Sequence, residues 1–272
     1  MADTLILKDR VRNTIQLGES NSREFKPALE GPPNCKKQRP VREICRNIAE
    51  PLVGNWPRHR RLQPELLESA EPALADRNLC DLARINRWFG GHRALLQILS
   101  DLAEPIEPFT LLDIGAGSGD MGWSIRERFP GSRVTSLDRR SFHLRRAQVP
   151  RVAADAFQLP FRHASFDFVL CSSLLHHFPD CRVVELIAAL RPFARRALII
   201  LDVERHPLPY CFLPLTRWLL NWSQMTVHDG CISVAAAFRP VELQRLAHAA
   251  GIAPVSVRRH RPWFRMSLVV ST

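Results

Sequence analysis

One segment constrains the fold of this chain more than any other: an apolar run from Leu111 leads directly into Gly115-Ala116-Gly117-Ser118-Gly119-Asp120. Alternate glycines let the backbone turn tightly, and they let a ligand lie against the main chain because no Cβ intervenes. A dinucleotide-binding loop has its third glycine three residues after the second, where the next helix holds a pyrophosphate. Here that position is Asp120, whose carboxylate would repel a phosphate, and the third glycine comes one residue early, at Gly119. The loop therefore predicts a nucleoside ligand that carries no phosphate, and S-adenosylmethionine is the first candidate.

Beyond residue 110 the chain alternates apolar segments with segments of helical periodicity. The predicted strands are 110–114, 133–137, 152–154, 166–171 and 197–203, and the predicted helices between them are 120–129, 141–146 and 180–190. A later helix begins with Pro240 in its first turn and ends before Gly251, and segments 254–258 and 265–270 are predicted to form an antiparallel hairpin. Continuous apolar strands separated by helices are typical of a parallel sheet covered on both faces, so the expected fold class is α/β.

Polar side chains follow several predicted strands, at the edge where open α/β sheets bind their ligands. Asp138 follows the second strand, where a carboxylate can accept hydrogen bonds from both hydroxyls of a ribose. Asp155 and Ala156 follow the third strand and are placed to bind the amino group of adenine. The segment 171–178, which contains two adjacent histidines, follows the fourth strand. These positions predict a binding site for an adenosine.

Together these segments resemble the class I S-adenosylmethionine-dependent methyltransferases. The resemblance is to the branch that shares its domain, methyltransferase type 11, with enzymes of ubiquinone and menaquinone biosynthesis. It covers about residues 80–272, and the segments that carry it are 112–120, 136–139, 154–161, 165–167 and 175–178. It implies a Rossmann-like fold with a seven-stranded, mostly parallel sheet, an antiparallel last strand and three α/β/α layers. It also implies S-adenosylmethionine as the cofactor.

The resemblance assigns roles to individual positions. The cofactor-binding residues that it implies are Asp113, Gly115, Gly117, Ser118, Gly119, Asp138, Arg139, Asp155, Ala156 and Ser172. The loop residues would pack against the methionine and ribose part, and Asp113 would support the amino-acid moiety. Asp138 would bind the ribose, Asp155 and Ala156 the adenine, and Ser172 would lie beside the bound cofactor.

The two adjacent histidines have alternative explanations. His177 either caps the next helix or faces a ligand, and the first alternative is the simpler one. His176 is the candidate catalytic residue, as a general base that removes a proton from a phenol or enol, or as a donor that orients the acceptor. Methyl transfer from a sulfonium gains most from holding donor and acceptor in line, so a base is optional. Gln224, His228 and Asp229 are weaker candidates of the same kind.

Two segments after the fifth strand bear on the acceptor. An apolar insertion at about 206–236 either packs as an extra core helix or forms a lid that keeps water from the sulfonium. A lid this apolar favours a hydrophobic acceptor such as a polyketide-like phenol, a quinone precursor or a lipid. The basic segment 258–265 is either a solvated turn or a cationic rim that recruits a carboxylate, a phosphate, or an acyl-carrier or other acidic partner.

Residues 1–75 lack sustained periodicity and are rich in proline and charge, so we expect a basic, poorly ordered extension before a methyltransferase domain over 76–272. The seven cysteines show no Cys-x-x-Cys pairing, which is typical of reduced thiols, and we expect no metal ligands. No apolar run reaches the roughly 18 residues that span a bilayer, and no signal peptide is recognisable. We therefore expect a cytoplasmic protein, with peripheral contact as the remaining mode of membrane association.

The sequence favours a methyltransferase that transfers a methyl group from S-adenosylmethionine to a hydrophobic small molecule by direct SN2 displacement. The net charge of +11 suggests an RNA or DNA methyltransferase as an alternative, although a GC-rich coding bias is the favoured explanation of the arginine excess. The sequence has neither an Asn/Asp-Pro-Pro-aromatic motif nor a Pro-Cys nucleophile, so a nucleic-acid partner is not expected. A further alternative is a module that binds the cofactor without turnover. A nicotinamide dehydrogenase is disfavoured by Asp120.

Overall fold

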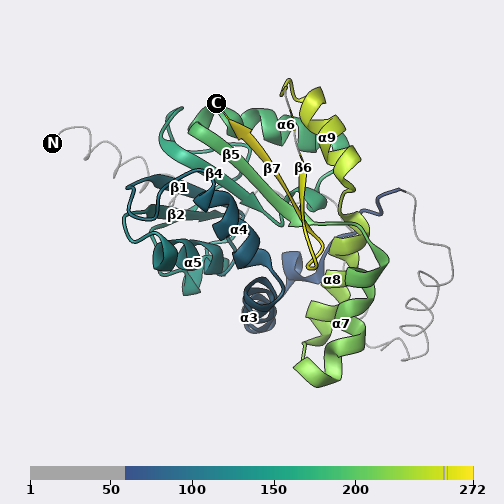
Figure 1. The fold of residues 1–272 in the computed structure, drawn as a ribbon. Coiled ribbons are helices and arrows are strands. Elements are labelled where there is room, and N and C mark those ends of the chain that lie inside the picture. The colour runs from purple at the N-terminus through teal and green to yellow at the C-terminus, as the bar shows by residue number, and fades with distance from the viewer. Residues whose placement is uncertain (1–58, 254, 256, 272) are drawn as a thin grey trace, which may run out of the picture. The chain divides into compact units, whose positions relative to one another are not determined.

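The computed structural model describes residues 59–253, 255 and 257–271, and its central element is a seven-stranded sheet with the order β3-β2-β1-β4-β5-β7-β6 (Figure 1). The strands are β1 Thr110–Ile114, β2 Arg133–Asp138, β3 Arg151–Ala153, β4 Phe166–Ser172, β5 Ala194–Val203, β6 Val257–His260 and β7 Arg265–Ser271. Strands β1 to β5 pair in parallel, whereas β7 runs antiparallel to both β5 and β6. This topology confirms the predicted Rossmann-like fold.

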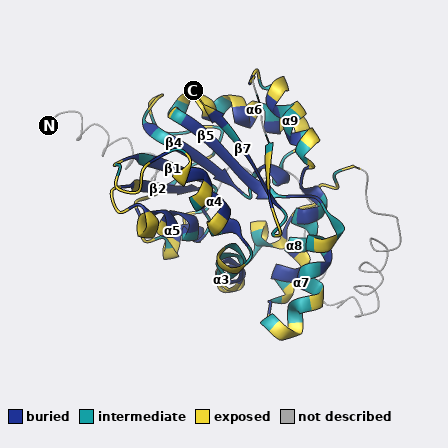
Figure 2. Cartoon of the chain, in the orientation of Figure 1, coloured by how far each residue is buried: buried dark blue, intermediate teal, exposed yellow. Residues whose placement is uncertain are grey.

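Helices cover both faces of the sheet (Figures 1 and 2). Helices α4 (Gly91–Ser100) and α5 (Asp120–Arg128) bury their apolar side chains in one cluster with the strands. Helices α6 (Asp180–Leu190) and α9 (Pro240–Ala249) contribute to a second cluster. Neighbouring residues of β4 belong to different clusters, Val169 to the second and Leu170 to the first. Burial on both faces therefore explains why the strands are continuously apolar rather than alternating.

The connections differ from the predictions in two places. The segment 141–146 forms only a short 3-10 turn, His143–Arg146, and the chain leaves it in an extended conformation at Ala147, which packs closely against Gly119. Strand β6 begins at Val257 and ends at His260, later than the predicted 254–258. The other short turns are Leu66–Ser69, Leu175–His177 and Arg191–Phe193. The helices and strands otherwise match the predicted ranges within a few residues.

Residues 59–75, which the sequence assigns to the extension, contact the rest of the described structure. Helix α3 spans Pro72–Trp88, and the described residues from His59 onward belong to one compact unit. Arg60 donates hydrogen bonds to the carbonyl oxygens of Ala236 (2.6 Å) and Phe178 (2.9 Å), and Glu65 is buried. Such contacts with distant segments leave no local periodicity, so the sequence could not reveal them. Of the extension predicted over residues 1–75, residues 1–58 lie outside the described residues.

The insertion after β5 folds into two helices, α7 (Pro207–Leu220) and α8 (Gln224–Ala236), which lie side by side (Figure 1). Asn221 ends α7 with a positive φ of 52°, and the Ser223 hydroxyl caps α8 by accepting a hydrogen bond from the N–H of Thr226 (3.0 Å). Among the described residues, no helix has the length and apolar character needed to span a membrane.

Candidate active site

The glycine loop makes the sharp turn that the sequence predicts between β1 and α5. Gly115, Gly117 and Gly119 have φ values of 68°, 52° and 73°, a region that side chains with a Cβ rarely adopt. A Cβ added to Gly119 would lie 2.6 Å from the Cβ of Ala147. Glycine is therefore required at this position both by the backbone conformation and by packing.

A pocket of about 750 Å³ opens above the carboxyl ends of the strands, within the range of small-molecule sites. The residues of the predicted cofactor site that line it are Asp113, Gly115, Gly117, Ser118, Asp138, Arg139, Asp155, Ala156 and Ser172. Gly119 does not line the pocket, and its contact with Ala147 gives it a packing role instead. One cavity thus brings together the residues that follow β1, β2, β3 and β4.

The Asp138 carboxylate is held in a fixed orientation at the end of β2. Its Oδ2 accepts a hydrogen bond from the N–H of Gly117 (3.0 Å), and its Oδ1 accepts one from the N–H of Arg140 (2.9 Å). The Nδ1 atom of His143 lies 3.2 Å from the same Oδ1. Asp155 is exposed, and its Oδ1 accepts a hydrogen bond from the N–H of Phe157 (2.8 Å). Both carboxylates retain lone pairs for a ligand, since each oxygen accepts more than one hydrogen bond.

Asp113 is a buried carboxyl group at the end of β1, and within the described structure its Oδ2 has no hydrogen-bond partner. Burial raises the pKa of Asp113 well above its ordinary value, and the nearby Asp120 and Asp138 raise it further. A buried polar atom without a partner destabilises the free protein. The amino group of a ligand in the pocket would supply that partner, and this orphaned oxygen therefore fits the predicted cofactor.

Asp120, the first residue of α5, accepts hydrogen bonds from Ser118 Oγ (2.9 Å) and Asn86 Nδ2 (3.1 Å), and its Oδ2 lies 2.8 Å from His92 Nε2. Burial opposes ionisation, but these contacts, above all with His92, lower the pKa of Asp120. An anion therefore stands at the helix start where a dinucleotide fold would bind a phosphate. This agrees with the argument against a nicotinamide cofactor.

The far end of the pocket is apolar. It is lined by side chains of α3, α7 and the β6–β7 hairpin, among them Leu79, Leu82, Ile85, Phe89, Phe212, Leu213 and Trp263. The insertion thus contributes to the wall of the pocket as well as packing against its neighbours. Its tip is different: Trp218 and Leu219 are 87% and 83% exposed, and they do not line the cavity.

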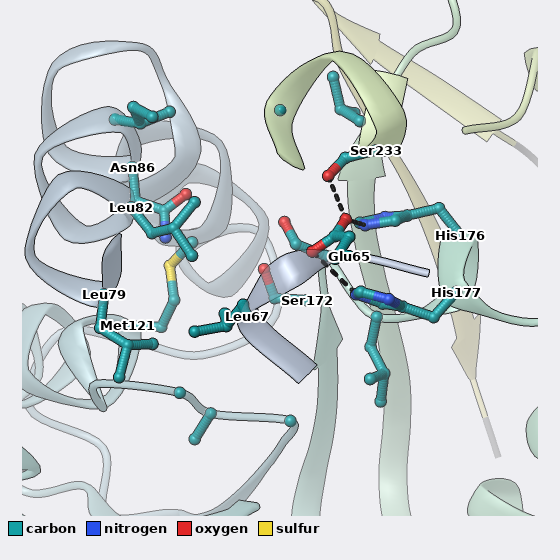
Figure 3. A pocket seen from close by; sticks show the side chains of 18 of the residues that line it. Glu65, Leu67, Leu79, Leu82, Asn86, Met121, Ser172, His176, His177 and Ser233 are labelled. Atoms are coloured by element: carbon teal, nitrogen blue, oxygen red, sulfur yellow. Dashed lines mark hydrogen bonds and ion pairs between the residues drawn. The ribbon is translucent and has the colours of Figure 1, made fainter. Parts of the chain in front are cut away.

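A polar group interrupts this apolar wall (Figure 3). His176 is buried, its Nδ1 lies 2.8 Å from Asp202 Oδ1, and its Nε2 lies 3.6 Å from Glu65 Oε1. Burial alone would lower the pKa of His176, but Asp202 and Glu65 outweigh it and raise this pKa to about 10. A histidine that already holds its proton at neutral pH donates a hydrogen bond and does not accept a proton. Of the two roles predicted for His176, the geometry favours the orienting donor.

His177 faces the same polar group rather than only capping a helix. Its ring stacks on that of His176 with centroids 4.5 Å apart. Its Nδ1 lies 3.3 Å from Glu68 Oε1, and its Nε2 lies 4.0 Å from Glu65 Oε2. Figure 3 shows Glu65, Ser233 and both imidazoles directed toward one another. The weaker candidates Gln224, His228 and Asp229 do not line the pocket, and Asp229 binds the N–H groups of Leu66 and Leu67 instead.

The arginines of the basic segment 258–265, which forms the β6–β7 hairpin, have two kinds of environment. Arg258 forms an ion pair with Asp101 (2.6 Å), and Arg259 and Arg261 form ion pairs with Glu204 (3.3 and 3.0 Å). Arg265 is buried and lines the pocket, where its guanidinium donates to Ser173 Oγ (3.4 Å) and Asn86 Oδ1 (3.2 Å). Burial lowers the pKa of Arg265 from its ordinary value.

Sequence reasoning missed Glu65, Glu68 and Asp202, and it included Arg265 only as part of the basic segment 258–265. Asp202 could have been found, because it follows the apolar run of the fifth strand just as Asp138 follows that of the second. Glu65 and Glu68 lie in the segment assigned to the extension, where no local pattern marks them as buried.

Comparison with known proteins agrees with this geometry. The sequence model of a family described as a methyltransferase domain matches residues 112–195. The ubiquinone/menaquinone biosynthesis C-methyltransferase UbiE of Paracoccus denitrificans is 31% identical over 48% of this chain and 55% of its own length. A malonyl-[acyl-carrier protein] O-methyltransferase of Dechloromonas aromatica is 28% identical over 80% of this chain and 78% of its own length.

The chain spans about half the length of the quinone-biosynthesis relatives that it matches. Among solved structures, a SAM-dependent methyltransferase from Aquifex aeolicus superposes with a TM-score of 0.53 at 14% identity, covering 74% of this chain and 98% of that one. At this identity the likeness shows the fold alone, and it agrees with the strand order β3-β2-β1-β4-β5-β7-β6. Residues 112–195 therefore match the sequence model of a methyltransferase domain, and the described structure has a fold that solved methyltransferases share.

Proposed function

We propose that this protein transfers a methyl group from S-adenosylmethionine to an oxygen-bearing hydrophobic small molecule. The observation that carries the proposal is that one pocket joins the glycine loop and the carboxylates of β1 and β2 to an apolar chamber with a polar end. The cofactor would supply an electrophilic methyl group on a sulfonium. The chain would contribute binding, alignment and exclusion of water.

Asp113, Asp138 and the loop residues Gly115 and Gly117 would hold the cofactor. The Asp138 carboxylate would accept hydrogen bonds from the ribose hydroxyls, because the N–H groups of Gly117 and Arg140 already fix its orientation. Asp113 would accept a hydrogen bond from the amino group of the methionine moiety, because its Oδ2 accepts none from the described residues. Asp155 and Ala156, at the mouth of the same pocket, would bind the adenine.

The acceptor would lie between α3 and α7, with its apolar body against Leu82 and Phe212 and a polar atom toward His176. Asp202 holds the imidazole in one orientation through its Nδ1. His176 would then orient the acceptor through Nε2, while alignment with the methyl donor supplies most of the rate. A phenol, a quinone precursor or a polyketide-like ring combines the apolar surface and the oxygen that this chamber requires.

Two experiments test the proposal. Titration calorimetry should show that the purified protein binds S-adenosylhomocysteine. Incubation with methyl-labelled S-adenosylmethionine and a panel of hydrophobic phenols and acyl compounds should give a methylated product by mass spectrometry. Cofactor binding with no turnover on the panel would support the non-catalytic alternative, and salt-sensitive retention on RNA or DNA would support the nucleic-acid alternative.

Docking of an acyl-carrier protein on the basic hairpin stays a separate hypothesis. The ion pairs of Arg258, Arg259 and Arg261 with Asp101 and Glu204 offset much of the positive charge that such docking would need. Equal turnover of a free acyl acceptor and of the same group on a carrier protein would argue against carrier docking.

A further inference from the structure

We propose that Glu65, His176 and His177 form a binding site for one first-row divalent transition-metal ion at the acceptor end of the pocket. The ligand atoms would be the Nε2 atoms of the two imidazoles and the carboxylate of Glu65. In the described structure one ligand atom from each of these residues lies within 4.8 Å of the others, and all three residues line the pocket.

The separations between these atoms suit a shared cation better than direct hydrogen bonds. The Nε2 of His176 lies 3.6 Å from Glu65 Oε1, and the Nε2 of His177 lies 4.0 Å from Glu65 Oε2. A good N–H···O hydrogen bond spans about 2.7–3.2 Å. Two ligands of one tetrahedral ion, each about 2.1 Å from the metal, lie roughly 3.4 Å apart. The carboxylate thus faces both rings at nearly the distance that an ion between them would set.

In each histidine the ring nitrogen that would not bind the metal lies next to a carboxylate, as is usual for metal-ligating histidines. The Nδ1 of His176 lies 2.8 Å from Asp202 Oδ1, and the Nδ1 of His177 lies 3.3 Å from Glu68 Oε1. A carboxylate on one ring nitrogen fixes the ring and increases the basicity of the other nitrogen. Both rings therefore direct their second nitrogen toward Glu65 (Figure 3). Ser233 Oγ donates to Glu65 Oε1 and holds the carboxylate in the same position.

The charge around the site is also suitable. Three carboxylates, Glu65, Glu68 and Asp202, surround the two imidazoles. Since histidine ligates as the neutral imidazole, the ion would displace to solvent the proton that His176 holds in the metal-free protein. Guanidinium groups act electrostatically on the two outer carboxylates: Arg60 and Arg265 on Asp202, and Arg139 on Glu68. A divalent ion would offset the charge of the carboxylate that would ligate it, Glu65.

The donor set indicates the class of metal. Two imidazole nitrogens and one carboxylate suit zinc, iron(II), cobalt(II) or manganese(II), whereas magnesium and calcium prefer oxygen ligands alone. Three protein ligands leave at least one position open. In a step that rests on the proposed function, this open position would bind the oxygen of the acceptor and fix it relative to the methyl donor. With the ion bound, this contact would replace the direct hydrogen bond from His176 Nε2 to the acceptor.

Cobalt(II) is a suitable probe because its visible absorption reports the ligands. We would titrate the metal-free full-length protein with cobalt(II) and compare it with Glu65→Gln and His177→Gln, after circular dichroism has shown that each variant is folded. His163→Asn is the control, because His163 is exposed and does not line the pocket. We expect one bound equivalent in the wild type and the control, and binding at least ~10-fold weaker in both variants.

Two results would overturn the inference: a wild-type protein that binds no more cobalt(II) than Glu65→Gln, or a His177→Gln variant that binds as tightly as the control. Calorimetry with S-adenosylhomocysteine on the metal-free protein separates this inference from the proposed function. Retained nucleoside binding without cobalt(II) binding would overturn the metal site alone. Cobalt(II) binding without nucleoside binding would overturn the cofactor assignment alone.

Discussion

The backbone N–H of Gly117 donates a hydrogen bond to the Oδ2 of Asp138 over 3.0 Å. This contact joins the loop after β1 to the carboxylate that ends β2, so the two parts of the expected nucleoside site hold each other in place. The carboxylate is 9% exposed, enough to meet a ligand in the pocket while the protein fixes its orientation.

Replacing Asp138 by alanine should weaken binding of S-adenosylhomocysteine by about 1–3 kcal/mol, because the hydrogen bonds to the ribose hydroxyls are lost. Titration calorimetry measures the change. Asp167→Ala is a matched control, because Asp167 also accepts a backbone hydrogen bond, from Thr110 (2.7 Å), but does not line the pocket. Equal affinities of Asp138→Ala and wild type would rule out the ribose contact.

Replacing Asp113 by asparagine should stabilise the ligand-free protein and weaken nucleoside binding. Burial raises the pKa of this carboxyl group, so its contribution to stability is full below its unfolded pKa and is lost as the pH rises through its folded pKa. Asparagine does not titrate, and the gain should therefore grow with pH above the ordinary value of 3.8. Thermal unfolding at acidic and alkaline pH measures the gain. A difference in stability between Asp113→Asn and the wild type that shrinks as the pH rises would contradict the prediction.

Deletion of residues 1–58 should leave nucleoside affinity unchanged, whereas deletion of residues 1–70 should destabilise the domain by about 1–3 kcal/mol. The longer deletion removes Arg60, whose side chain donates hydrogen bonds to the carbonyl oxygens of Ala236 and Phe178. It also removes Glu65, which accepts a hydrogen bond from the Ser233 hydroxyl. Denaturant unfolding of the two truncated proteins tests this difference. Equal stabilities would mean that segment 59–70 contributes nothing to the fold.

Replacing Gly90 by alanine should destabilise the protein by about 1–3 kcal/mol. Gly90 has a φ of 78°, and an added Cβ would lie 2.2 Å from Cδ1 and 2.6 Å from Cβ of Trp263. The ring must then move, and since Trp263 lines the pocket the acceptor chamber should change with it. Gly90→Ala combined with Trp263→Gly, which removes the Cβ as well as the ring, should recover the part of the loss that comes from the clash. A double variant whose losses simply add would show that the clash is absent.

The sheet could be predicted from the sequence because its signals are local. Segments such as 110–114 and 180–190 carry their own periodicity, and each corresponds to an element with the same bounds, β1 and α6. The turn at 143–146 has weaker local signals, and it ends where Ala147 packs against the distant Gly119, a contact that no local pattern marks. Strand β6 has only its last residue, His260, buried, so its sequence scarcely marks its bounds.

The site could be predicted only where its residues follow a strand. Asp138 and Ser172 line the pocket as the parallel sheet requires. Glu65 lies far from them in sequence, and long-range contacts with His176 and Ser233 alone place it there. The protonation state of His176 also depends on long-range contacts. Burial alone would lower its pKa, whereas Asp202 and Glu65, which lie in other segments, raise it.

Glu65 lies outside the stretch that matches the family, residues 112–195. Of the groups that face the apolar chamber, those of α3, α7 and the hairpin tip lie outside it too. Exchange of these flanking segments would therefore change which acceptor molecule the protein takes, while the sheet and the proposed nucleoside site stay the same. Natural variation in what such proteins modify should be concentrated in the residues before β1 and after β5.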